Sequence, residues 1–110
     1  MMDTVQAFIK EIKEKAHVQP LLSKADLSIE FITEMDRISM SFHDGNVLIN
    51  SDRKSQYCEM IGKETGMIAL MEGKEKLRSL AEKKALSIKA PFRTILLLES
   101  IFYLAKKEPD

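Results

Sequence analysis

The C-terminal segment from Ala90 to Lys107, APFRTILLLESIFYLAKK, limits how this chain can fold more than any other stretch. Pro91 suits the first turn of a helix, and Pro109 prevents the helix from continuing past the segment. Apolar side chains point almost all round the predicted helix, and only Glu99 and Ser100 interrupt them. An ordinary surface helix has one apolar stripe and a polar back, so this helix cannot expose its back to water cheaply.

Three arrangements would satisfy such a helix. It can be buried on two sides as a central core helix, it can join another subunit, or it can close over an apolar ligand. Periodicity alone does not choose among them. The segment is too short to span a bilayer, which needs roughly 20 apolar residues.

Composition narrows the class of protein. A chain of 110 residues predicts one domain, residues 1–110, with one core. Lys plus Arg and Asp plus Glu both total 17, so no net field favours nucleic acid as a partner. Cys58 is the only cysteine, which excludes an internal disulfide and fits a reducing compartment. No signal peptide or C-terminal address is evident, so we expect a cytoplasmic protein.

The first half of the chain predicts a helix followed by strands. Apolar residues recur at helical spacing from Val5 to Ala16, and Asp3 or Thr4 is the expected cap of a helix that ends near His17. From Asp26 the period changes to two, which is typical of strands with one buried face. The expected strands are Leu27–Phe31, Ile38–His43 and Val47–Ile49, as an antiparallel meander, and then Gln56–Ile61.

The second half predicts helices over the sheet. Thr65 is the expected cap of a helix that stops at Gly73, and a short helix should follow from about Lys74 to Lys84. Leu86–Ile88 is the expected fifth strand, before the C-terminal helix. Antiparallel strands first and helices later predict an α+β fold, with a mostly antiparallel five-stranded sheet and helices over one face.

Signals for catalysis are weak. His43 and Asp44 are adjacent like a base and its orienting carboxylate, but they lie in a predicted hairpin turn, and an exposed corner explains them better. Cys58 is better explained as a small strand side chain than as a nucleophile. Glu99 is expected at a solvent edge of its helix, or facing the polar end of a ligand. The histidines and the cysteine lack metal-ligand spacing, so we expect no metal and no cofactor.

Methionines are the better functional indication. Met35, Met40, Met60, Met67 and Met71 lie in or beside apolar segments. Methionine is flexible and polarisable, and it suits surfaces that adapt to irregular apolar shapes. Ordinary core filling explains these residues about as well. Together with the apolar final helix, however, they indicate more apolar lining than one small core needs.

The order of these motifs resembles the sterol carrier protein 2 family over roughly Ser28 to Lys107. The resemblance is carried by ISMSFHDGNVLI (38–49), CEMIGKETGMIALMEGKEKL (58–77) and LSIKAPFRTILLLESIFYLA (86–105). Gly73-Lys74 occupies the place of the family's Gly-Lys helix end. Ala90 replaces the usual glycine before the last helix, so the entry to that helix should be less sharp. The chain lacks the targeting tripeptide of peroxisomal members, which points to a bacterial member.

The resemblance implies an apolar tunnel between sheet and helices, closed in part by the last helix, and a protein that binds sterols, fatty acids, fatty acyl-CoAs or phospholipids without catalysis. The expected partners are a lipid or fatty-acyl ligand and, through a basic segment from Lys74 to Arg93, an anionic membrane surface. One alternative is an accessory module that presents an apolar intermediate to an enzyme or dimerises through the last helix. Another is an enzyme that uses His43 or Glu99. The oligomeric state stays open between a monomer and a homodimer. The residues expected to line the cavity are Phe31, Met40, Phe42, Met60, Met67, Met71, Leu98, Ile101 and Phe102.

Overall fold

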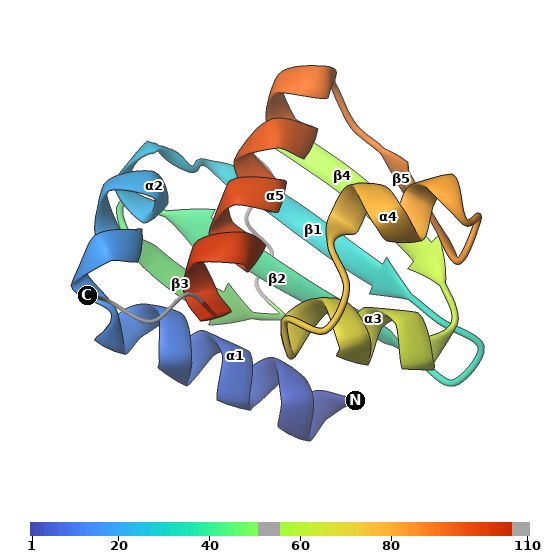
Figure 1. Ribbon diagram of the computed structural model, residues 1–110. Helices are drawn as coiled ribbons and strands as arrows, with labels where there is room; N and C mark the ends of the chain where they lie inside the picture. Colours follow the sequence, from blue (N-terminus) through green and yellow to red (C-terminus); the bar gives the residue numbers. More distant parts are fainter. Residues whose placement is uncertain (51–55, 107–110) are drawn as a thin grey trace.

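The computed structural model describes residues 1–50 and 56–106. Five strands form one sheet in the order β3-β2-β1-β4-β5, and all the helices lie over one face of it (Figure 1). The α+β class, with helices over one face of a five-stranded sheet, is confirmed. The elements are α1 (Met2–Glu14), a 3-10 helix (Ala16–Val18), α2 (Gln19–Lys24), β1 (Leu27–Ile32), β2 (Arg37–His43), β3 (Asn46–Ile49), β4 (Gln56–Gly62), α3 (Glu64–Met71), α4 (Leu77–Glu82), β5 (Leu86–Lys89) and α5 (Phe92–Lys106).

The first three strands form the predicted antiparallel meander. Asp44 and Gly45 make the β2–β3 turn with φ values of 51° and 78°, as a tight hairpin requires. β4 does not extend the meander, because it returns to pair in parallel with β1, and β5 then pairs antiparallel with β4. β1 is therefore central, and the sheet is mostly antiparallel as expected.

Side chains of the inner sheet face and the helices make one core. Ile29, Met40 and Cys58 stand side by side on neighbouring strands, and each is at most 1% exposed. On the outer face, Tyr57 is 53% exposed; its hydroxyl oxygen lies 2.7 Å from Glu30 Oε1 and 3.1 Å from Glu59 Oε2, and its one proton is shared between these acceptors. Because these carboxylates favour the protonated phenol, the pKa of Tyr57 lies above its ordinary value.

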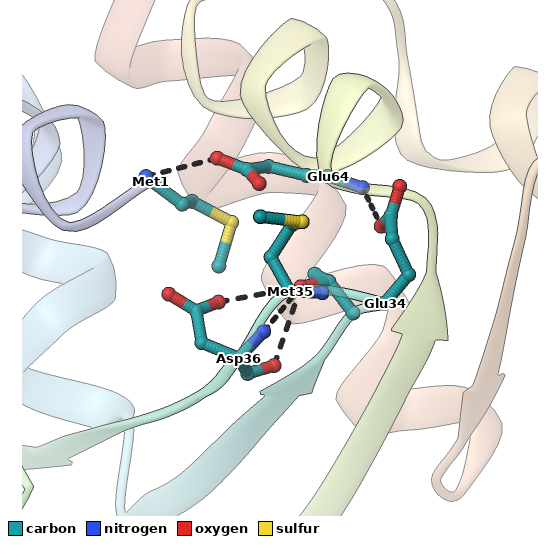
Figure 2. A network of polar contacts seen from close by, with 6 residues as sticks. Met1, Glu34, Met35, Asp36 and Glu64 are labelled. Atoms are coloured by element: carbon teal, nitrogen blue, oxygen red, sulfur yellow. Dashed lines mark hydrogen bonds and ion pairs between the residues drawn. The ribbon is translucent and has the colours of Figure 1, made fainter.

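The predicted local caps of two helices are wrong. α1 begins at Met2 with no side-chain cap, and α3 begins at Glu64, before Thr65. The carboxylate of Glu34, in the β1–β2 turn, accepts a hydrogen bond of 2.8 Å from the Glu64 backbone N–H and so caps α3 from another element (Figure 2). That bond holds the pKa of Glu34 below its ordinary value. A residue distant in sequence does what a local cap would do.

The surrounding contacts fix the β1–β2 turn beside the helices. Thr33 Oγ1 accepts hydrogen bonds from the backbone N–H groups of Met35 and Asp36, both at 3.1 Å. The amino group of Met1 lies 3.0 Å from Glu64 Oε1, so the start of α1 meets the start of α3 at the same place (Figure 2). The turn, α1 and α3 are thus tied together at one end of the sheet.

Gly62 should not tolerate a side chain, because a Cβ there would lie 2.7 Å from the Ala85 carbonyl oxygen and 2.8 Å from Leu86 Cβ. We expect Gly62→Ala to lower the free energy of unfolding by about 1–3 kcal/mol, as overpacking does. The control is Gly66→Ala in α3, where the nearest of these atoms would be 3.7 Å away. That change should stabilise by roughly 0.5–1 kcal/mol, because alanine favours helix more than glycine does. Urea unfolding of both variants checks that the two changes in the free energy of unfolding have opposite signs. Destabilisation by both substitutions would contradict this account.

Candidate functional site

The C-terminal end of α5 is held by side chains from the first part of the chain. His17 Nε2 lies 2.8 Å from the Leu104 carbonyl oxygen, and Lys15 Nζ donates to the Ala105 carbonyl oxygen. The Lys15 ammonium at the Ala105 carbonyl complements the negative end of the helix dipole, and the His17 ring contacts the neighbouring carbonyl. The last turn of α5 is therefore capped by residues that precede it by most of the chain.

Glu11 joins the same cluster through two ion pairs. Its carboxylate lies 3.0 Å from Lys15 Nζ and 2.5 Å from Lys106 Nζ, so it links α1 to the end of α5. Desolvation acts to raise the pKa of Glu11, but the hydrogen bonds from Lys106 and Lys15 outweigh it, and the pKa lies below its ordinary value. These contacts fix where α5 lies over the sheet.

The residues predicted to line a cavity come together in the core. They converge from β1, β2, β4, α3 and α5, and none is more than 4% exposed. They pack against one another as a continuous apolar layer between the sheet and the helices. Their role in ligand binding stays a prediction. The set is Phe31, Met40, Phe42, Met60, Met67, Met71, Leu98, Ile101 and Phe102.

A concavity of about 500 Å³ opens beside this layer, between the α3–α4 connection and α5, and we call it the α5 pocket. Its floor is apolar, because Leu70, Leu77 and Phe102 are at most 4% exposed and still line it. Phe102 therefore belongs to both the core layer and the pocket. The pocket is lined by Leu70, Gly73, Glu75, Lys76, Leu77, Glu99, Ser100, Phe102, Tyr103 and Lys106.

Gly73 shapes one wall of the α5 pocket. It ends α3, as predicted, and has a φ of 76°, which L side chains rarely adopt. A Cβ on Gly73 would also collide with the side chain of Lys106. The glycine thus lets the α3–α4 connection pass close to α5.

The charges at the rim of the α5 pocket are mostly compensated. Glu99 is 3.3 Å from Arg78, and Glu75 is 3.0 Å from Lys83. Lys106 is paired with Glu11. Among the residues the structure describes, Lys76 has no such carboxylate partner; its ammonium lies over the Tyr103 ring, 5.9 Å from the centroid. Within residues 1–50 and 56–106, the pocket therefore presents one positive charge without a carboxylate partner, that of Lys76, above an apolar floor.

Four lining residues of the α5 pocket were not predictable as site residues from the sequence: Leu70, Leu77, Lys76 and Tyr103. Leu70 and Leu77 look like ordinary core positions of short helices, and they face a pocket only because α5 lies across them. Lys76 was part of a basic run without a distinguishing signal. Tyr103 was visible as an aromatic residue in the apolar helix, but its direction depends on how α5 is placed.

A second concavity, of about 1180 Å³, lies among β4, β5, α3 and α4. Its lining includes the apolar residues Ile61, Leu80 and Leu86 and the basic residues Lys63 and Lys84. It is wider and more open than the α5 pocket, so it would leave more of an apolar ligand in contact with water. Small-molecule sites bury most of their ligand, which favours the α5 pocket as the candidate site.

The other candidates for chemistry lie outside the α5 pocket, apart from Glu99. His43 is at the hairpin corner, as expected, with Nδ1 3.3 Å from Asp26 and Nε2 3.0 Å from Asp44, and it does not line the pocket. Asp44 reaches the imidazole because the turn bends it back, which simple strand alternation did not predict. Burial raises the pKa of the Cys58 thiol to about 11, so this thiol is protonated at neutral pH.

Within residues 1–50 and 56–106, no helix has the length and apolarity that crossing a bilayer demands. In the same part of the chain, no three His, Cys, Asp or Glu side chains gather as metal ligands would.

Comparisons with known proteins give a relative and several similar structures, while no family model matches. The SCP2 domain-containing protein YusD of Bacillus subtilis is 30% identical over 88 residues, which are 79% of this chain and 77% of that protein. The structure of UbiJ-SCP2, a ubiquinone synthesis protein, has a TM-score of 0.74 at 11% identity and covers 94% of this chain and 96% of its own. Sterol carrier protein 2 from Yarrowia lipolytica, in its apo form, has a TM-score of 0.60 at 14% identity, with coverages of 96% and 89%. At these identities the solved structures show the fold alone.

Proposed function

The chain belongs to the sterol carrier protein 2 (SCP2) family, whose fold supports lipid binding, and we propose that residues 1–110 act as one domain that binds an amphipathic lipid with an anionic head group in the α5 pocket. A fatty acid or a fatty acyl-CoA has this chemistry. The observation that carries the proposal is the unmatched Lys76 at the rim of a pocket with an apolar floor. A role as carrier, a cytoplasmic location and the oligomeric state stay predictions.

The two parts of the pocket suit the two parts of such a lipid. Burial of the acyl chain against Leu70, Leu77 and Phe102 supplies about 25 cal/mol for each Å² of apolar surface removed from water. The head group gains an ion pair with Lys76, and Ser100 and Tyr103 also line the pocket. The volume of about 500 Å³ is within the usual range of roughly 300–1,000 Å³ for small-molecule sites. A longer chain would extend by parting the apolar layer that includes Phe102 and Met71.

Lys76→Met tests this assignment. We expect the affinity for a fluorescent fatty acid to fall about tenfold, because a hydrogen bond to a charged group contributes roughly 1.5–3 kcal/mol and 1.4 kcal/mol is tenfold. The affinity for a fatty alcohol of the same chain length should change little. The matched control is Lys74→Met in the same connection, since Lys74 pairs with Glu72 and does not line the pocket.

Three outcomes would count against the proposal. The wild-type protein could fail to take up either lipid, and mass spectrometry of the purified protein could find no bound acyl species. Equal losses of fatty-acid affinity in Lys76→Met and Lys74→Met would contradict the assignment of Lys76 to the head group. Equal affinity for acid and alcohol in the wild type would do the same.

An accessory module that presents an apolar intermediate to an enzyme is the second candidate. It is favoured by the similarity to a ubiquinone synthesis protein and by apolar side chains exposed on α5. It predicts a stable complex with a protein partner, or a dimer through α5, in the absence of lipid. Light scattering of the purified protein, with and without a fatty acid, distinguishes this candidate from the first.

A further inference from the structure

α5 exposes an apolar stripe on the side opposite its buried residues, which are Thr94, Leu98, Ile101, Phe102 and Ala105. Phe92, Leu96 and Tyr103 are 66%, 36% and 53% exposed. Their spacing of four and seven residues places them on one side of the helix. Two aromatic rings and a leucine in one exposed row are more than the scattered apolar residues of an ordinary surface, and such a row marks an interaction site.

Cations accompany this stripe along its length. The Arg78 guanidinium lies 6.0 Å from the Phe92 ring centroid, and the Lys76 ammonium lies 5.9 Å from the Tyr103 centroid. Arg93 is exposed beside Phe92. Glu99 is the acidic residue of the stripe, and Arg78 pairs with it at 3.3 Å. The face is therefore net positive, although the whole chain is neutral.

Aromatic rings beside Lys and Arg are typical of surfaces that enter the interface of a bilayer. The rings sit at the level of the head groups, and the cations contact anionic lipids. A second copy of this chain fits the face less well. In a two-fold dimer the same patch meets itself, so a net positive face would meet a second net positive face.

We propose that this aromatic-basic stripe, made of Phe92, Leu96 and Tyr103 with Lys76, Arg78 and Arg93, docks the protein on an anionic lipid bilayer. This inference extends the proposed function, because Lys76 and Tyr103 belong to both the stripe and the α5 pocket. Docking would hold the rim of the pocket against the membrane, where a lipid can pass between the bilayer and the pocket without crossing water.

The test measures binding of ligand-free protein to vesicles by co-sedimentation. Wild-type protein should bind vesicles of phosphatidylcholine with phosphatidylglycerol more tightly than vesicles of phosphatidylcholine alone, and salt should reduce the difference. Arg93→Glu should weaken binding to the anionic vesicles about tenfold or more. Phe92→Ser should weaken binding to both kinds. The control is Lys13→Glu, an equal change of charge on the exposed side of α1, which should have little effect.

The test of membrane docking can be separated from the test of ligand binding, because Phe92 and Arg93 do not line the α5 pocket. Arg93→Glu should bind a soluble fluorescent fatty acid as the wild type does, and loss of vesicle binding with this affinity intact supports docking. Equal effects of Arg93→Glu and Lys13→Glu would overturn it, as would equal binding to both kinds of vesicle at low salt. A dimer that Phe92→Ser dissociates, without vesicle binding by the wild type, would assign the stripe to a protein interface. Failure of the wild type to bind the soluble fatty acid would count against the proposed function alone.

Discussion

Leu98→Glu is expected to unfold the protein at neutral pH. Leu98 is 0% exposed on the side of α5 that faces the core. An ionised carboxylate there would be buried without a partner, which costs several kcal/mol, and the lost leucine packing adds roughly 2–5 kcal/mol. A domain of this kind is stable by only about 5–15 kcal/mol. Thermal denaturation followed by circular dichroism should show a weak transition or none.

Leu96→Glu is the matched control on the same helix. Leu96 is 36% exposed, so its replacement should change the free energy of unfolding by about 0.5 kcal/mol or less. Similar losses of stability in Leu98→Glu and Leu96→Glu would contradict the orientation of α5, in which Leu98 faces the core and Leu96 faces water. The two leucines also limit how a predicted dimer could form through this helix. Because Leu98 faces the core, an interface would have to use the exposed side that carries Leu96.

Phe102→Ala is expected to cost about 3–5 kcal/mol of stability. The ring is 4% exposed, and its centroid lies 5.1 Å from that of Phe8 with the two rings tilted by 33°, so aromatic side chains join α5 to α1. Affinity for a fatty acid should fall as well, because the ring is also part of the floor of the α5 pocket. Urea unfolding measures the loss of stability. Titration with a fluorescent fatty acid, at a temperature well below the midpoint of thermal unfolding, measures the loss of affinity.

Phe92→Ala provides the comparison, since the same substitution on the same helix removes a ring that is 66% exposed. Its loss of stability should be about 1 kcal/mol or less, because most of the ring already faces water and its cation–π contact with Arg78 is an exposed one. A small loss in Phe102→Ala, with a large loss of affinity, would mean that Phe102 faces a cavity and not the packed core. A large loss of stability with unchanged affinity would remove Phe102 from the ligand site.

Much of the fold was predictable because the signals are local. Alternation in Leu27 to Phe31 and in Ile38 to His43 marks which side chains face the core, and the positive φ angles of Asp44 and Gly45 match the turn expected there. The C-terminal helix was predictable from its proline and its apolar run. Burial in the core was one of three arrangements that the sequence left open for this helix, and in the structure one side of it is buried while Phe92, Leu96 and Tyr103 stay exposed. The order of these elements was enough to indicate the family.

The tertiary structure alone decided which elements meet. Periodicity shows that a side chain faces the core, but not which neighbour it contacts, so the parallel pairing of β4 with β1 was not predictable from the strands. The cap of α3 by Glu34 and the capping of α5 by His17 join residues far apart in the chain. The α5 pocket has the same origin. Leu77, Lys76 and Tyr103 belong to different segments, and they form a site because α5 is fixed across the α3–α4 connection by contacts at its far end.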